Sequence, residues 1–85
     1  MENEIKKLGL IFKTKRKELN LSLKEAENAT SIRTTYLESI EEGNDEKFLS
    51  PVYMQGFMRQ YANFLELDVE KIINDFPQAA QFQSQ

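Results

Sequence analysis

Two aromatic residues four positions apart, Tyr53 and Phe57, are the side chains of this sequence best suited to binding a partner. Aromatic residues dominate interface hot spots because they bury a large area with few rotatable bonds to immobilise. Both belong to the stretch SPVYMQGFMRQYANFL (residues 50–65), which predicts a helix. Ser50 can cap this helix and Pro51 fits its first turn.

The same stretch carries two adjacent apolar rows at helical spacing, although a helix on a small domain usually buries only one. The first row consists of Met54, Met58, Tyr61 and Leu65. The second row consists of Tyr53, Phe57 and Phe64, with Gln60 between the last two. We predict that the first row is core, that Tyr53 and Phe57 face outwards, and that Gly56 admits a neighbouring backbone. The alternative is that the loop at Phe48 or a later helix covers both aromatic residues.

Catalytic and metal-binding chemistry has few candidates in this chain. Cysteine and histidine are both absent, which removes thiolate sites, the commonest general base and the commonest zinc ligand. Asn44, Asp45 and Glu46 fit a turn, because a calcium loop needs a longer, regularly spaced set of oxygen ligands. We therefore expect no enzyme activity, no cofactor and no metal site.

The charge of the 85 residues is unevenly distributed. The net charge is −3, but residues 1–33 hold eight basic and five acidic side chains, whereas residues 34–85 hold three basic and nine acidic ones. Such asymmetry orients a protein toward charged partners. The sequence has neither an apolar run of membrane-spanning length nor a signal peptide, so we expect a cytoplasmic chain. We also expect the chain to be monomeric in isolation.

The pattern of apolar residues predicts an all-α domain of five helices. The predicted helices cover about 4–19, 22–29, 34–42, 50–65 and 69–76, with a capping box at Ser22, a stop at Gly43 and a cap at Asp68. The expected inner face of the first helix comprises Ile5, Leu8, Phe12 and Leu19, and that of the second Leu23, Ala26 and Ala29. We place the domain at 1–76 and a disordered polar tail or linker at 77–85.

The second and third helices, joined by a short turn, form a candidate helix-turn-helix. Such a motif could read DNA through the start of its third helix, and a generic helical bundle without that role is the alternative. Here Arg33, Thr34 and Thr35 could contact bases. No basic residue follows Arg33 in this helix, which instead carries Glu38, Glu41 and Glu42. Because DNA binding depends on neutralising phosphates, this composition disfavours a DNA reader.

Two segments resemble known proteins. NLSLKEAENATSIRTTYLESIEEG (residues 20–43) resembles the Cro/C1-type helix-turn-helix, and SPVYMQGFMRQYANFLELD (residues 50–68) resembles the extension found in the RodZ family of bacterial cell-shape proteins. The resemblance implies a cytoplasmic domain that binds MreB, the bacterial actin homologue, and links its filaments to the membrane and to the cell-wall synthesis or division machinery. A sequence-specific DNA-binding regulator remains the alternative.

The resemblance also implies roles for individual residues. The family contacts MreB through aromatic residues of its fourth helix, which correspond to Tyr53 and Phe57, and Gln60 continues the same row. Cro/C1-type domains join an arginine of the first helix to a glutamate of the third, here Arg16 and Glu41. RodZ-type proteins have one transmembrane helix, so we expect these residues to be part of a longer protein at the cytoplasmic face of the inner membrane, or a truncated family member.

Two positions depart from the family pattern. Lys15 and Glu27 stand where small alanines are common in the first two helices. We expect Glu27 to tilt outwards or the second helix to rotate slightly. Leu23 stands where DNA-binding relatives often have a glutamine that contacts phosphate, which again favours protein binding over DNA binding.

Overall fold

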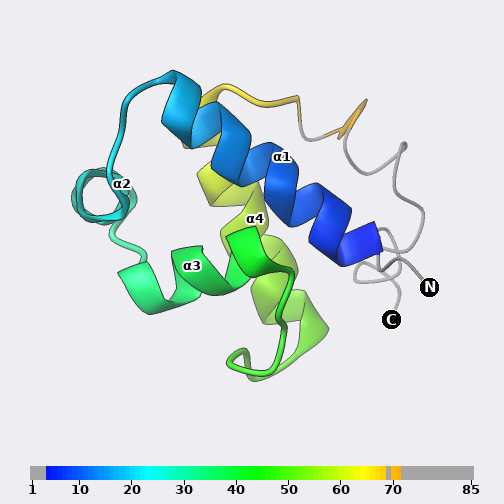
Figure 1. The fold of residues 1–85 in the computed structure, drawn as a ribbon. Coiled ribbons are helices and arrows are strands. Elements are labelled where there is room, and N and C mark those ends of the chain that lie inside the picture. Colours follow the sequence, from blue (N-terminus) through cyan, green and yellow to red (C-terminus); the bar gives the residue numbers. More distant parts are fainter. Residues whose placement is uncertain (1–3, 69, 72–85) are drawn as a thin grey trace.

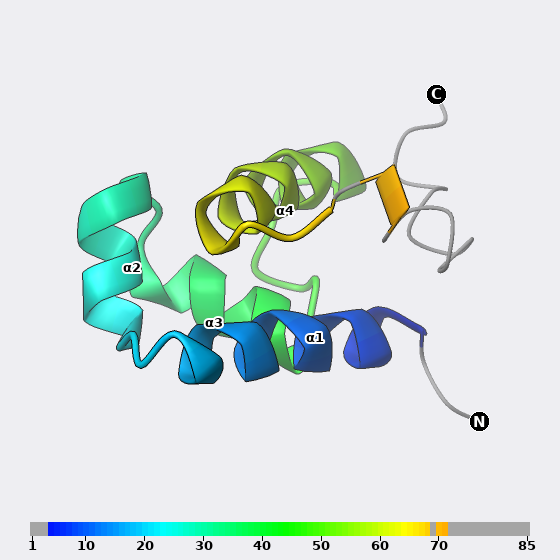
Figure 2. The ribbon, with the colours of Figure 1, turned by 90° about the horizontal axis from the view of Figure 1, so that it is seen from above.

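The computed structural model describes residues 4–68 and 70–71. In this part of the chain four α-helices and no strand are present: α1 (Glu4–Glu18), α2 (Leu23–Thr30), α3 (Thr34–Glu42) and α4 (Pro51–Leu65). α2 stands at one end of the molecule and connects α1 to α3, while α4 crosses behind α1 and α3 (Figure 1). Seen from above, α4 lies along one side of the molecule and α1 along the other (Figure 2).

Local sequence sets the helix ends. Ser22 and Glu25 form the predicted capping box, in which the Glu25 N–H donates to Ser22 Oγ at 3.0 Å and the Ser22 N–H donates to Glu25 Oε1 at 2.8 Å. Asn20 adopts the left-handed conformation with φ 58°, just after α1. Gly43 ends α3 in the same conformation with φ 69°, where glycine has no Cβ to clash. The bounds predicted for the third helix are confirmed, and so are those of the fourth, which runs from Pro51 to Leu65 after the Ser50 cap.

The core lies where α4 meets the three earlier helices. All four members of its predicted inner row are buried, and Tyr61 stacks on Phe12 of α1 with ring centroids 5.3 Å apart. Leu8, Leu37 and Ile40 complete the centre of this core with no exposed surface or almost none. The helix-turn-helix thus depends on α4 to cover its apolar side.

Two predicted core positions are wrong. Leu19 is 41% exposed because α1 ends at Glu18 and Leu19 already belongs to the following turn. Ala29 is exposed because the inner face of α2 passes from Leu23 and Ala26 to Thr30, one turn beyond Ala26. The Thr30 hydroxyl donates to the Ala26 carbonyl at 2.7 Å, so this polar side chain is satisfied at the edge of the core.

The close backbone approach occurs at Gly9, not at Gly56. A Cβ atom at Gly9 would collide with the backbone oxygens of Ile40 and Glu41, so glycine lets α1 pack directly on the end of α3. A Cβ atom at Gly56 would meet nothing within 4 Å. The prediction that Gly56 admits a neighbouring backbone is therefore wrong.

The predicted fifth helix falls largely outside the described residues. Glu70 and Lys71 are helical, and the Lys71 N–H donates to Asp68 Oδ1 at 3.2 Å, as expected if Asp68 caps a helix. The predicted domain end at residue 76 and the polar tail 77–85 also lie outside these residues. Within the described part of the chain, no helix is both long enough and apolar enough to cross a membrane.

Candidate functional site: an apolar surface on α4

Apolar side chains gather in solvent where α4 begins. Ser50 caps this helix by accepting a hydrogen bond from the Tyr53 N–H at 3.4 Å, and Pro51 occupies its first turn. The exposed fractions are 86% for Leu49, 61% for Val52 and 54% for Tyr53. Tyr53 therefore faces outwards, as its place in the second row predicts.

Phe57 differs from this prediction, since it is half-buried instead of standing free. Its ring stacks on Tyr36 of α3 with centroids 5.3 Å apart, and it also meets Phe48 at 5.8 Å. Tyr36 and Phe48 are themselves in ring contact at 5.2 Å. The loop residue Phe48 thus covers one side of Phe57, and the remaining side is available to a partner.

A shallow depression of about 290 Å³ lies between these side chains. Its lining residues are Val52, Tyr53, Gly56, Phe57 and Gln60. Gly56 is one of the lining residues, and a Cβ atom at this position would meet nothing within 4 Å. Gln60 is exposed at the far end, so the three residues predicted to bind a partner do line one surface. We call this surface the α4 depression.

Sequence reasoning missed the contributions of Leu49 and Val52. Both are more exposed than Tyr53. Val52 lies one turn before Gly56, so extending the helical row backwards from Gln60 would have found it. Leu49 precedes the helix and follows no helical pattern, so nothing in its spacing marks it.

A buried polar group lies beneath the opposite end of α4. Arg16 and Glu41, the pair implied by the resemblance, are joined by two hydrogen bonds, from Nε to Oε2 at 2.7 Å and from Nη2 to Oε1 at 3.0 Å. Arg16 Nη1 also donates to the Leu21 carbonyl at 2.8 Å, and the Tyr61 hydroxyl donates to Glu41 Oε2 at 2.5 Å. Only 10% of the Arg16 side chain and 4% of the Glu41 side chain are exposed.

These contacts shift two ionisation equilibria. The hydrogen bonds to Glu41 raise the pKa of Arg16 above its ordinary value, so the guanidinium stays charged. Burial, and then the contact with the Glu41 carboxylate, raise the pKa of Tyr61 above its ordinary value. No buried side-chain nitrogen or oxygen among the described residues lacks a hydrogen-bond partner. The hydrogen-bonded side chains of Arg16, Glu41 and Tyr61 therefore link α1, α3 and α4, which is a structural role.

The outer side of α3 is less acidic than its sequence suggests. Glu41 points into the core and is neutralised by Arg16, so only Glu38 and Glu42 present carboxylates to solvent. At the start of the helix Arg33 and Thr35 are exposed. Arg33 makes no side-chain capping bond. The side chains that could reach a DNA base are thus accessible, although the acidic residues beside them oppose phosphate.

The unusual residues of the first two helices are accommodated at the surface. Glu27 is half-buried and pairs with Lys24 at 3.2 Å, so its carboxylate turns toward solvent. Lys15 is half-buried beside Leu67 at the edge of α1. Leu23 is partly buried and packs against the core. None of these contacts disturbs the helix-turn-helix.

A model of a helix-turn-helix domain family, HTH_25, matches residues 11–72, which is most of the chain. The chain belongs to this family. The matched region extends through all of α4, so the α4 depression is part of the family domain and not an addition to it.

Two bacterial relatives are similar to part of the chain. The chain is 33% identical over 55 residues to the uncharacterized membrane protein YmfM of Bacillus subtilis, a match that covers 65% of the chain. It is 35% identical over 60 residues to an uncharacterized protein of Haemophilus influenzae, which covers 69% of the chain. The matches take in only 19% and 20% of these relatives, so the chain spans about a fifth of their length.

A solved structure is also similar. It is the crystal structure of a helix-turn-helix containing hypothetical protein from Chlamydia trachomatis, in a sub-domain swap conformation. The two sequences are 47% identical, and the match covers 94% of the chain and 77% of the Chlamydia protein with a TM-score of 0.53. This likeness supports the helix-turn-helix fold of the family.

Metal binding has no candidate in the part of the chain that the structure describes, where no three His, Cys, Asp or Glu side chains lie close enough to hold an ion. The expectations that the chain is not an enzyme and takes no cofactor stay predictions.

Proposed function

We propose that the chain is the cytoplasmic adaptor domain of a RodZ-type protein and binds the bacterial actin homologue MreB through the α4 depression. In this role it links MreB filaments to the membrane and to the cell-wall synthesis or division machinery. The family membership is consistent with a RodZ-type domain, and the relative YmfM is named a membrane protein. A membrane segment outside these residues would hold the domain at the cytoplasmic face of the inner membrane.

The observation that carries this proposal is the surplus apolar surface around Gly56. A glycine inside a helix destabilises it by about 1 kcal/mol relative to alanine, and no packing contact at Gly56 requires glycine. Around it lie the exposed Val52 and Tyr53 and the open side of Phe57. A hollow lined by apolar and aromatic side chains is a typical receptor for an anchor residue of a partner.

The experiment that tests this proposal is a titration of Tyr53→Ala against MreB of the same organism. An interface hot spot should lose about 2 kcal/mol or more of binding free energy on truncation. The melting temperature should hardly change, because Tyr53 is 54% exposed. Leu10→Ala is the matched control, since Leu10 is similarly exposed on α1. Unchanged MreB binding by Tyr53→Ala would contradict the proposed site.

Phe57→Ala does not separate the effect on MreB binding from the effect on stability. Its removal takes a ring from the contacts with Tyr36 and Phe48, so we expect this variant to lose both stability and MreB binding. Gln60→Ala separates the two effects at the far end of the depression, because Gln60 is exposed and its loss should affect binding alone.

Sequence-specific DNA binding by a transcriptional regulator is the second candidate, and it is favoured by the accessible Arg33 and Thr35 at the start of α3. We expect only weak, non-specific binding, at about 10⁻⁴–10⁻⁶ M near physiological salt, because Glu38 and Glu42 lie on the same helix. Tight, sequence-dependent binding of a duplex that is lost in Arg33→Ala would support this candidate instead.

A further inference from the structure

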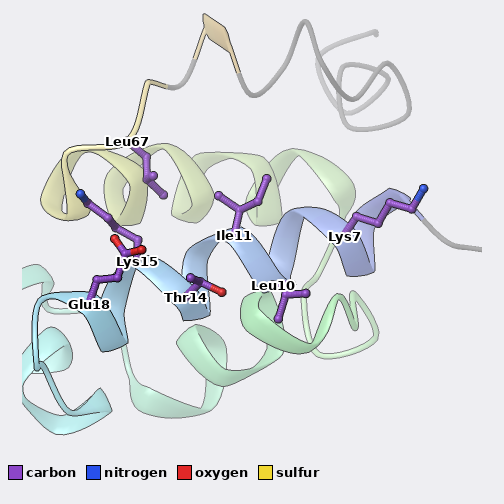
Figure 3. Close-up of a pocket in the computed structure, with 7 residues that line it drawn as sticks. All are labelled: Lys7, Leu10, Ile11, Thr14, Lys15, Glu18 and Leu67. Atoms are coloured by element: carbon purple, nitrogen blue, oxygen red, sulfur yellow. The ribbon is translucent and has the colours of Figure 1, made fainter.

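The outer face of α1 carries a group of lysines around one exposed leucine. Leu10 is 60% exposed at the centre of this face. Four of its neighbours at helical spacing, three, four or seven residues away, are exposed lysines: Lys6, Lys7, Lys13 and Lys17. We call these five residues the lysine face. In Figure 3, Ile11 and Leu67 point toward each other between α1 and the segment after α4, whereas Leu10 points away from α4.

No described interaction neutralises this face. The ion pairs among residues 4–68 and 70–71 are Arg16–Glu41 and Lys24–Glu27, and neither involves the lysine face. Glu42 lies beside it, in a depression that it shares with Lys6, Lys7 and Lys13, but forms no ion pair with them. The face thus presents four unpaired positive charges along about 16 Å of helix.

This arrangement does not stabilise α1. Lys13 and Lys17 are four residues apart, and like charges at this spacing destabilise a helix by roughly 0.2–0.5 kcal/mol. Leu10 gains nothing from the core because it lies on the opposite side of α1 from Leu8 and Phe12. A negatively charged partner would relieve the repulsion, and an apolar layer behind that charge would accommodate the leucine.

We infer that the lysine face binds an anionic lipid surface, with the four ammonium groups among the headgroups and Leu10 at their boundary with the acyl chains. Lysine-rich helices with apolar anchors bind membranes in this way. Nucleic acid fits less well, because a phosphate backbone would leave the exposed Leu10 without a favourable environment.

The lysine face shares no residue with the α4 depression, so the two surfaces can be tested separately. The probe is a suspension of phosphatidylcholine vesicles with about one third phosphatidylglycerol, and vesicles of pure phosphatidylcholine are the neutral comparison. We expect the chain to sediment with the anionic vesicles at about 0.02 M salt, less so at about 0.15 M, and not with the neutral ones.

The variants assign this binding to the lysine face. Each lysine near an anionic surface contributes about fivefold in affinity, so Lys7→Gln with Lys13→Gln should weaken binding by about 25-fold. The matched control is Lys24→Gln with Lys47→Gln, which changes the net charge equally at exposed sites elsewhere and should alter binding by about twofold or less. Leu10→Gln should weaken binding without any change of charge.

Several results would overturn the inference. They are equal binding to neutral vesicles, no binding to anionic vesicles at low salt, and equal losses in the two double variants. Full binding by Leu10→Gln would show that the leucine does not meet the lipid. Tighter binding to duplex DNA than to the vesicles, lost in Lys7→Gln with Lys13→Gln, would assign the face to nucleic acid. Circular dichroism of each variant verifies that the exposed substitutions leave the fold intact.

Discussion

The glycines of α1 and α4 have opposite surroundings. Gly9 lies against the backbone of α3, where a single methyl group would collide with Ile40 and Glu41. Gly56 lies in the open, where a methyl group would meet nothing within 4 Å. The same residue type therefore brings two helices together in one region and leaves a hollow in the other.

The two regions also differ in how far their side chains are satisfied by contacts within the chain. Where α1 and α3 meet, Arg16, Glu41 and Tyr61 satisfy one another away from water. Where α4 begins, Val52 and Tyr53 remain in solvent with no described partner for their apolar surface. The polar groups of the first region are satisfied within the described residues, whereas the second region leaves apolar side chains in solvent, where we propose that a partner binds. Substitutions should therefore affect stability in the first region and binding in the second.

The largest expected effect on the first region comes from Arg16→Met. Removing one member of a buried ion pair leaves the other charge uncompensated, which typically lowers the free energy of unfolding by about 3–5 kcal/mol. Glu41 would keep only its hydrogen bond from Tyr61. Urea unfolding at neutral pH measures the loss. Lys17→Met removes an exposed charge from the same helix and should change the free energy of unfolding by less than about 0.5 kcal/mol in either direction. Similar losses in the two variants would show that the buried ion pair contributes no more to stability than an exposed charge does.

Gly9→Ala should come next in size. Overpacking a tight contact typically costs about 1–3 kcal/mol, and we expect the upper end because the obstacle is backbone and cannot rotate away. The better helix propensity of alanine offsets only about 1 kcal/mol of this. Thermal unfolding gives the change. A variant as stable as the parent would mean that α1 and α3 can separate slightly without penalty, and the contrast between the two glycines would then be smaller than the geometry indicates.

Tyr61→Phe removes one hydrogen bond to the Glu41 carboxylate and should cost about 2 kcal/mol near neutral pH. This difference depends on pH. Because burial raises the pKa of Tyr61 above the ordinary value of 10.0, its contribution is fully present below pH 10 and is lost as the pH rises further. The unfolding free energies of the parent and the variant should therefore converge above pH 10. Parallel curves up to the alkaline limit would contradict this linkage.

Gly56→Ala should have the smallest effect on stability and the opposite sign. Alanine is the better helix former by about 1 kcal/mol, and at this site it meets no obstacle, so the protein should become more stable. The added methyl group would alter the lining of the α4 depression and should weaken MreB binding by about 1 kcal/mol or more. A gain in stability with unchanged MreB binding would place the interface elsewhere.

Sequence patterns predicted local features well and tertiary features poorly. The bounds of α3 and α4 follow from Gly43, Ser50 and Pro51, each of which acts on its own turn. The burial of Phe57 depends on its contact with Tyr36, a residue of another helix that no periodicity within α4 reveals. The role of Gly9 likewise depends on where α1 crosses α3.

The candidate site shows the same division. That Tyr53 faces solvent could be predicted from the row beside the core, whereas the exposure of Leu49, which precedes the helix, follows from no helical pattern. The pairing of Arg16 with Glu41 came from family resemblance, because twenty-five positions separate the two residues and nothing local links them. Unlike the helix ends, such pairs depend on the complete fold.

The hydrogen bond from Tyr61 to Glu41 also has a consequence for synthesis of the protein on the ribosome. Its donor belongs to the last of the four helices and its acceptor to the third, so a nascent chain that ends at Glu42 has an incomplete polar group and an uncovered Phe12 ring. At about 5–20 residues per second, translation of the remaining stretch to Leu65 takes roughly 1–5 s. During that interval the apolar side chains that α4 covers in the folded domain have no helix to pack against.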